Sequence, residues 1–263
     1  FLHPQAVIQD DLVRSLVEDN FEAYLVRNPV SAKTLIREFP DSVLLIQIDS
    51  GLSRDDWMSY ATEVKSNPVF AALTLCVLSV SDAESLREPF LGDESPFSHA
   101  ISYAKFDFGK TMRELQEYLT NEKTRLPRNQ VRGTSPESLG VSVVFVRDEV
   151  RYVGTLRDIT LAGLTCRLAQ EELLPSEVPI PAIIITYGKT QFSVVGRIAG
   201  KHGKDGLLHL ILFDEGTKSE RRKDIFDLIQ ACFQAETNAI IDAKSHKRQV
   251  MTKVPRANLY KRR

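Results

Sequence analysis

Hydrophobic residues follow two different periods in the first 122 residues of the chain. The helix candidates, in which apolar residues recur every three or four positions, are residues 7–17, 31–39, a segment opening at Ser53, and 109–121. The strand candidates, which are short apolar runs, are residues 1–4, 21–26, 42–49, 73–80 and 100–106. Ser53 is expected to cap the helix that it precedes. Because strands and helices alternate, the pattern predicts a parallel, doubly wound α/β sheet.

The composition changes between residues 123 and 136, where Arg, Lys, Pro, Gly and Ser replace the apolar pattern. We interpret this stretch as a linker between two domains, residues 1–122 and 137–263. Short apolar runs separated by turn residues predict that the second domain is a six-stranded antiparallel β-barrel. Its strand candidates are residues 140–147, 151–160, 163–168, 182–187, 191–199 and 207–213. A helix over residues 219–234 is expected to close this domain, ahead of a basic tail.

Charge is divided unevenly between the two halves of the chain. Residues 1–120 carry 10 Lys and Arg against 19 Asp and Glu, and the remainder carries 24 against 16. The halves therefore hold formal charges of about −9 and +8. This asymmetry suggests two modules with different partners, of which the second favours anions.

The cysteines and the hydrophobic runs exclude several classes of protein. Cys76, Cys166 and Cys232 lie far apart in apolar surroundings, which indicates neither a disulfide framework nor a metal cluster. No apolar run reaches the roughly 18 residues of a membrane span, and no secretory leader is visible, so we expect a cytoplasmic protein. The sequence begins at Phe1 and not at Met, so we expect a few residues upstream.

Two short patterns in the second half point to a site for an anionic, planar ligand. Arg128-Asn-Gln-Val-Arg132 places two guanidinium groups in the linker, where flexible backbone lets both turn onto one ligand. Asp158-Ile-Thr160-Leu-Ala-Gly163 places a carboxylate, a hydroxyl and a glycine at the bend between two strands. The alternative interpretation of the second pattern is an Asx-type turn in which Gly163 supplies a positive φ.

The first pattern is not specific by itself. With 20 arginines in 263 residues, about one or two matches to RxxxR are expected by chance. Arg147-Asp-Glu-Val-Arg151 is a second match, which we interpret as solvated charge on either side of a hairpin turn. The order and placement of the two patterns, ahead of and inside a predicted barrel, therefore carry the inference.

In this order the two patterns resemble those of PilZ domains, the bacterial receptor modules for cyclic di-GMP. The resemblance covers about residues 125–235 and includes RxxxR, D/NxSxxG, a six-stranded barrel and a closing helix. A receiver-like α/β domain ahead of the barrel is similar to the two-domain PilZ proteins of spirochaetes. Thr160 stands where the family pattern has Ser, and Ala162 where it commonly has a second Gly. Thr keeps the hydroxyl but adds a methyl group and stiffens χ1.

The resemblance implies a non-enzymatic receptor whose ligand is cyclic di-GMP, with no cofactor and no metal. Arg128 and Arg132 would bind phosphate oxygens or the guanine Hoogsteen edge, and Asp158 would accept from guanine N1 and N2. Thr160 would hydrogen-bond nearby, and Gly163 would let the backbone approach the ligand. Binding would tie the linker to the barrel and reorient the first domain, which would signal to a protein partner. Motility and virulence are the processes expected of the family.

Whether the first domain accepts a phosphoryl group depends on acidic and polar residues at its strand ends. The residues that fit the later positions of a receiver site are Asp49, Ser79 or Ser81, and Lys105. The acidic pair after the first strand is missing, because Asp10 and Asp11 fall on the polar face of the following helix. Mg²⁺ would bind poorly without it. We therefore expect a degenerate, receiver-like interaction domain.

Two other classes of function stay open at this point. One is a scaffold protein whose barrel has lost ligand binding and which acts through the acidic first domain. The other is a nucleic-acid binder that uses the basic residues after Asp242, a tail in which Tyr260 is the one aromatic residue. The five histidines show no metal spacing, and no Ser/His/Asp or Cys/His arrangement indicates an enzyme.

Overall fold

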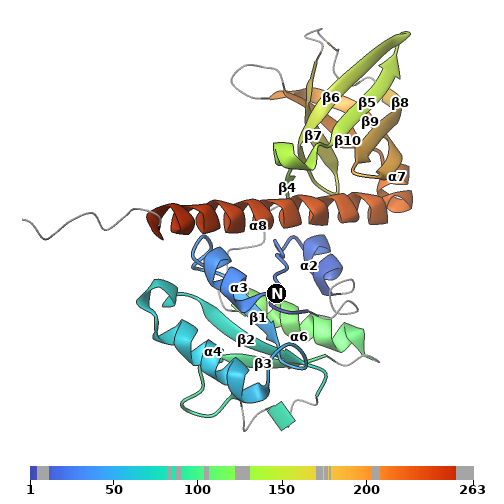
Figure 1. Cartoon of the computed structure of the whole chain (residues 1–263). Coiled ribbons are helices and arrows are strands. Elements are labelled where there is room, and N and C mark those ends of the chain that lie inside the picture. The colour runs from blue at the N-terminus through green and yellow to red at the C-terminus, as the bar shows by residue number, and fades with distance from the viewer. Residues whose placement is uncertain are drawn as a thin grey trace, which may run out of the picture.

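The computed structural model spans residues 1–263 and combines an α/β sheet with a β-barrel (Figure 1). We describe all residues except 5–11, 82–84, 87–89, 104–106, 122–130, 170–173, 175–176, 178, 203–207 and 253–263, and, at 202 and 245–252, the backbone only.

The first part of the chain forms a parallel sheet with helices packed on it. Its strands pair in the order β1(Val43–Gln47), β2(Thr74–Ser79) and β3(His99–Ser102). Its helical elements are α2(Arg14–Glu18), α3(Pro29–Leu35), α4(Arg54–Ser66), η2(Pro68–Phe70) and α6(Phe108–Asn121). The strands are almost entirely buried, as continuous apolar runs in parallel sheets require. The predicted parallel α/β sheet is confirmed.

The two earliest strand candidates are reduced to single bridges. Leu2 lies between Val26 and Ile46 and pairs in parallel with both. Including these bridges, the order across the sheet is that of a doubly wound fold, with the second segment outside the first. The first segment stops because His3 has a left-handed φ of 61° and Pro4 has no N–H to donate to a ladder.

Helix α4 begins as its sequence predicted. The Ser53 hydroxyl accepts a hydrogen bond from the Asp56 N–H at 3.2 Å, and Asp55 and Asp56 place negative charge in the first turn. One face of α4 packs against the sheet. It consists of the fully buried Trp57 and the buried residues that follow it at helical spacing. The cap thus fixes the point at which the chain leaves the carboxyl end of β1.

The second part of the chain is a closed antiparallel barrel. Its strands are β5(Ser142–Arg147), β6(Val150–Ile159), β7(Gly163–Leu168), β8(Pro179–Tyr187), β9(Thr190–His202) and β10(Leu208–Phe213). Among the residues described, these six strands form one ring, because the pairing of β6 with β7 joins the two ends of the order β6-β5-β8-β9-β10-β7. The predicted six-stranded antiparallel barrel is confirmed. Two short elements precede the ring, β4(Gly133–Thr134) and η3(Glu137–Leu139).

The closing helix is much longer than the predicted one. A short helix α7(Glu215–Glu220) precedes α8(Arg222–Thr252), whereas the apolar spacing predicted an end at Gln234. No Gly or Pro interrupts residues 222–252, so nothing in that stretch stops a helix. Beyond Gln234, the buried Thr237 and the partly buried Ile240 continue the contact with the α/β part.

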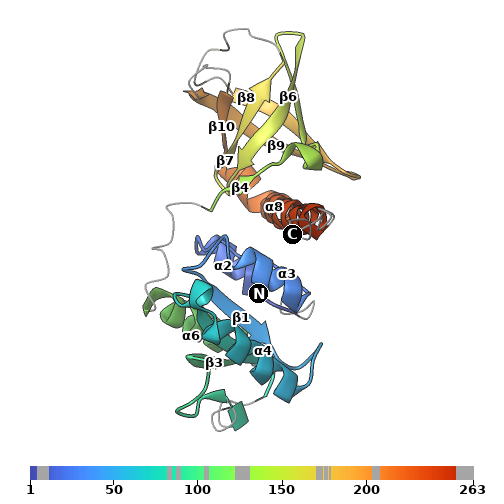
Figure 2. The same ribbon diagram turned by 60° about the vertical axis from the view of Figure 1, so that its left-hand side comes forward.

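Helix α8 lies between the barrel and the α/β part in both ribbon views (Figures 1 and 2). Its residues belong to a core that also contains barrel residues and Val13, Val17 and Ala23 of the first part. The Phe233 ring packs against that of Tyr24, with centroids 5.1 Å apart, and the Tyr24 hydroxyl donates to Glu236 Oε2 at 3.3 Å. One continuous apolar core therefore connects the two parts through this helix.

Polar contacts along α8 add to the apolar ones. The Arg222 Nε donates to Glu18 Oε1 at 2.7 Å, and the guanidinium of Arg14 lies 5.1 Å from the centre of the Phe226 ring. Further along the helix, Lys244 pairs with Glu38. These exposed pairs contribute little to stability individually, but they fix which side of α8 faces the first part.

All three cysteines are free and buried. Burial raises the pKa of the Cys166 thiol and that of the Cys232 thiol to about 12, so both remain protonated at neutral pH. In the described residues, no group of three or more His, Cys, Asp or Glu side chains is placed to hold a metal ion. No described helix is both long and apolar enough to cross a membrane.

Replacing Phe233 with Ala is expected to lower the free energy of unfolding by about 3–5 kcal/mol, because it leaves a cavity where the two parts meet. Urea unfolding followed by circular dichroism measures this. The exposed Lys223→Ala, which removes only a surface ion pair on the same helix, is expected to change stability by less than about 1 kcal/mol. Equal stability of both variants would show that α8 does not join the two parts energetically.

Candidate ligand-binding site

Residues from the two sequence patterns meet at the start of the barrel. Strand β4 pairs antiparallel with β6, so that Gly133 faces Ile159 and Thr134 faces Asp158. Arg132, directly before β4, has its Nε 3.8 Å from Asp158 Oδ1. Its side chain is 60% exposed and that of Asp158 is 16% exposed. The pair is therefore loose, worth less than about 1 kcal/mol, and its arginine is accessible to a ligand.

The backbone at Arg132 is anchored on both sides. Val131 is buried in the core shared with α8, and a Cβ at Gly133 would lie 3.1 Å from the Cys232 Cβ. Two residues further on, the Ser135 N–H donates to the Arg157 carbonyl at 2.9 Å. The backbone of Arg132 therefore lies in a stretch of chain that is packed on both sides. The flexibility that was expected of the backbone here is limited to the Arg132 side chain. Arg128 lies outside the described residues.

The Thr160 side chain closes the turn between β6 and β7. Its hydroxyl accepts from the N–H groups of Ala162 and Gly163 at 3.1 and 3.2 Å and donates to the Gly163 carbonyl at 3.2 Å. The Thr160 N–H also donates to that carbonyl, at 2.8 Å. An Asx-type turn would be held by the Asp158 carboxylate. Here the threonine hydroxyl holds the turn instead. Asp158 is left to interact with Arg132.

Gly163 is required by strand packing. A Cβ at this position would lie 2.3 Å from the Ile211 carbonyl oxygen and 3.1 Å from the Leu212 Cα, both on β10. Its φ is not positive, so the suggestion that it supplies a left-handed turn residue is wrong. Because Gly163 has no Cβ, β10 can approach β7 closely at this position. This contact lets the barrel close directly after the Thr160 turn.

The second RxxxR match flanks a hairpin turn as expected, but the Arg147 side chain is only 17% exposed, so the interpretation as solvated charge is wrong for this arginine. Arg147 ends β5, and the hairpin to β6 turns at Asp148 and Glu149, whose φ values are 48° and 65°. Arg147 Nε lies 3.3 Å from Asp148 Oδ2. These arginines therefore flank a two-residue turn of the type that matches strand twist, at the opposite end of β6 from Asp158.

A β-bulge at Arg157 was not predicted. The register between β6 and β7 shifts between Leu156 and Asp158, which leaves Arg157 as the extra residue, with an exposed side chain. Bulges redirect neighbouring side chains, and this one lies directly before Asp158. The sequence carries a signal for it, because the buried positions of β6 change from even to odd numbers between Leu156 and Ile159.

The carboxyl ends of β1 and β2 bring together two of the residues proposed for a receiver-type site. Ser79 Oγ donates to Asp49 Oδ1 at 2.6 Å, and the Val80 N–H donates to Asp49 Oδ2 at 2.9 Å. Of the two serines considered, Ser79 is therefore the one next to Asp49, and it also accepts from the Ser81 N–H. Asp10, Asp11 and Lys105 lie outside the described residues.

Neither a protein-family model nor a curated protein sequence matches the chain. Solved structures of PilZ domains match part of the chain.

One match is the PilZ domain with c-di-GMP of YcgR from Escherichia coli, with 14% identity, a TM-score of 0.33, and coverage of 49% of this chain and 100% of that one. Another is the PilZ domain of CeSA from a cellulose-synthesizing bacterium, with 14% identity, a TM-score of 0.27 and coverage of 34% and 89%. The PlzA protein of Borreliella burgdorferi in complex with c-di-GMP matches with 11% identity, a TM-score of 0.26 and coverage of 50% of each chain.

Gly163→Ala is expected to destabilise the barrel by about 3 kcal/mol, because its Cβ would force β7 and β10 apart. Gly200→Ala in β9 is the matched control, since a Cβ there meets nothing within 4 Å and its φ is not positive. It should leave stability unchanged or slightly raised. Urea midpoints compare the two variants, and a Gly163→Ala protein as stable as Gly200→Ala would contradict the packing role.

Proposed function

We propose that this chain is a non-enzymatic receptor for cyclic di-GMP, which binds where the start of β4 meets the end of β6. The observation that supports the proposal most directly is the 3.8 Å approach of Arg132 Nε to Asp158 Oδ1. Residues that are 26 positions apart in the sequence, and that were selected for their resemblance to the PilZ patterns, are neighbours in the fold. Chance matches to two short patterns have no reason to meet in this way.

The chemistry of the pair suits the ligand. Cyclic di-GMP carries two phosphates, which Arg132 can bind with paired N–H donors. Its guanine edges carry N–H groups at N1 and N2, and the Asp158 carboxylate can accept hydrogen bonds from them. Without ligand, the two side chains partly neutralise each other in a loose, exposed contact. Exchanging that contact for the ligand costs less than about 1 kcal/mol, against about 1.5–3 kcal/mol for each new charge-assisted hydrogen bond.

The remaining site residues have supporting roles in this proposal. Both acceptor positions of the Thr160 hydroxyl are occupied by backbone N–H groups, so it holds the turn that follows Asp158. Gly163 lets β10 pack beside that turn. Arg128 supplies the second guanidinium, as the PilZ resemblance implies.

We propose that the signal passes from the ligand to helix α8. Gly133, the residue after Arg132, packs against Ile229 and Cys232, so a shift of Arg132 onto a ligand acts on β4 and on the helix beneath it. The same helix contacts Tyr24 in the α/β part. In this proposal the acidic α/β part carries the change to a protein partner.

Isothermal titration with cyclic di-GMP tests the receptor. Wild-type protein is expected to bind at micromolar or lower concentration, and Arg132→Ala, Asp158→Asn and Arg128→Ala to weaken binding about tenfold or more each, since each removes a charge-assisted contact. Arg147→Ala is the matched control from the hairpin and should bind as the wild type does. Absence of binding by the wild-type protein would refute the receptor, and equal losses in Arg147→Ala and Arg132→Ala would refute the site.

Small-angle scattering with and without saturating cyclic di-GMP tests the transmission. If β4 moves α8, the distance distribution should change on binding in the wild type and not in Arg132→Ala at the same ligand concentration. A scattering profile that does not change although titration shows full occupancy would contradict the transmission. The protein would then be a receptor that binds without rearrangement.

A further inference from the structure

A polar cavity of about 420 Å³ lies between helix α8 and the segment that leads into α3. Its polar lining residues are Arg27, Asn28, Ser31, Gln234, Thr237 and Asn238. The lining residues from α8 are at positions 234, 237, 238 and 241, which lie on one face of the helix. This face is opposite the loop before α3 and the first turn of α3. No barrel residue is among those that line it.

The groups that line this cavity suit a small anion. Arg27 is exposed, and none of the carboxylates described lies within ion-pair distance of it. The described lining residues include no Asp or Glu. Residues with hydroxyl and amide groups line the same cavity as Arg27 from both sides, so the cavity offers several hydrogen-bond donors to one negatively charged group.

Thr237 provides an independent sign that a polar partner belongs here. The residue is 1% exposed, and its Oγ1 has no hydrogen-bond partner among the described residues. An unsatisfied buried hydroxyl is rare in folded proteins because it loses its bonds to water without replacement. Thr237 is among the residues that line the cavity.

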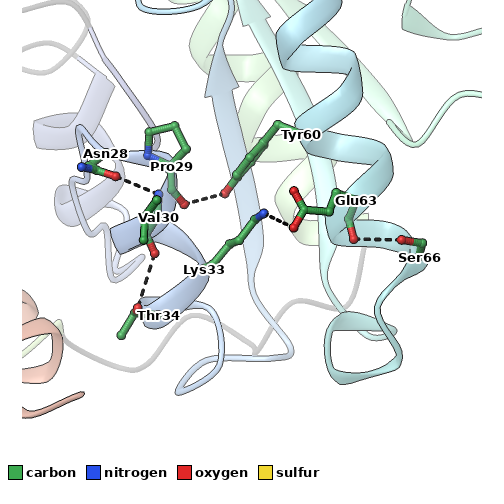
Figure 3. A network of polar contacts seen from close by, with 8 residues as sticks. All are labelled: Asn28, Pro29, Val30, Lys33, Thr34, Tyr60, Glu63 and Ser66. Carbon is green, nitrogen blue, oxygen red and sulfur yellow. Dashed lines mark hydrogen bonds and ion pairs between the residues drawn. The ribbon is translucent and has the colours of Figure 1, made fainter. Parts of the chain in front are cut away.

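The α3 wall of the cavity is held in place by its own hydrogen bonds (Figure 3). The Asn28 Oδ1 accepts from the Val30 N–H at 2.8 Å, and the Tyr60 hydroxyl donates to the Pro29 carbonyl at 3.2 Å. Lys33 pairs with Glu63 at 2.5 Å on the far side of the helix. On the opposite wall, Gln234 Nε2 donates to Asn238 Oδ1 at 3.1 Å. A ligand would therefore meet groups whose positions are already fixed.

We propose that this cavity is a second ligand site, which binds the phosphate group of a small phosphate ester. A phosphate presents three acceptor oxygens in different directions, which matches one guanidinium surrounded by donors from two walls. The volume is larger than a phosphate alone requires and lies in the range of small-molecule pockets, so the ester carries a polar organic part. Binding there joins α3 to α8 and makes that interface more stable.

Titration calorimetry and thermal unfolding with glycerol 3-phosphate, inorganic phosphate and glycerol, at constant ionic strength, test this site. Glycerol 3-phosphate is expected to bind saturably and to raise the unfolding temperature, inorganic phosphate to bind more weakly, and glycerol not to bind. Arg27→Gln should weaken binding about tenfold or more, and the near-isosteric Thr237→Val about threefold to tenfold. Arg37→Gln, near the end of α3 and outside the cavity, is the matched control and should bind as the wild type does.

The outcomes separate this site from the barrel site. Arg132→Ala should bind glycerol 3-phosphate normally, and Arg27→Gln should bind cyclic di-GMP normally, because the two sites share no residue. Absence of saturable binding of either phosphate compound by the wild type would overturn the proposal. Equal binding by Arg27→Gln and Arg37→Gln would do so too.

Discussion

The burial of one wide face of helix α8 against both parts of the chain is the constraint on which the rest of the structure depends. Ile229 and Cys232 face β4 and the barrel, whereas Phe226 and Phe233 face side chains of the α/β part. Each such apolar side chain contributes about 1.5–3 kcal/mol when it is removed from water. A narrow apolar face would have closed the barrel without contacting the first part. Because the face is wide, α8 packs against both parts at once.

This arrangement places the candidate site and the contact between the two parts on the same short piece of chain. Strand β4 has only two residues, yet it pairs with β6 on one side and packs on α8 on the other. Arg132 precedes it directly, so a force on that side chain reaches barrel and helix together. The switch that the sequence suggested was an ordering of the whole linker, whereas the transmission proposed above acts through Arg132, whose neighbours Val131 and Gly133 are already packed.

The sequence predicted the parts of the fold that repeat over many residues. The strands of the parallel sheet and of the barrel were visible as apolar runs, and the Ser53 cap and the Arg147 hairpin as short patterns with a physical cause. The contacts of β4 were not visible, because two residues are too few to form a pattern. The reason for Gly163 depends on β10, which only the folded chain brings near. The far end of α8 was missed although no residue there stops a helix.

The bridge between Leu2 and Val26 has a consequence for how the protein behaves at high concentration. An open sheet presents unpaired N–H and carbonyl groups along its outermost strands, which invites another chain to add a strand. Here one border of the sheet is the lone pairing of Leu2 with Val26, and the other is the four-residue β3, while the described strands of the barrel form a ring with no border. Among the residues that the structure describes, neither border offers a long template, so these two β-structures present little surface for strand-mediated self-association.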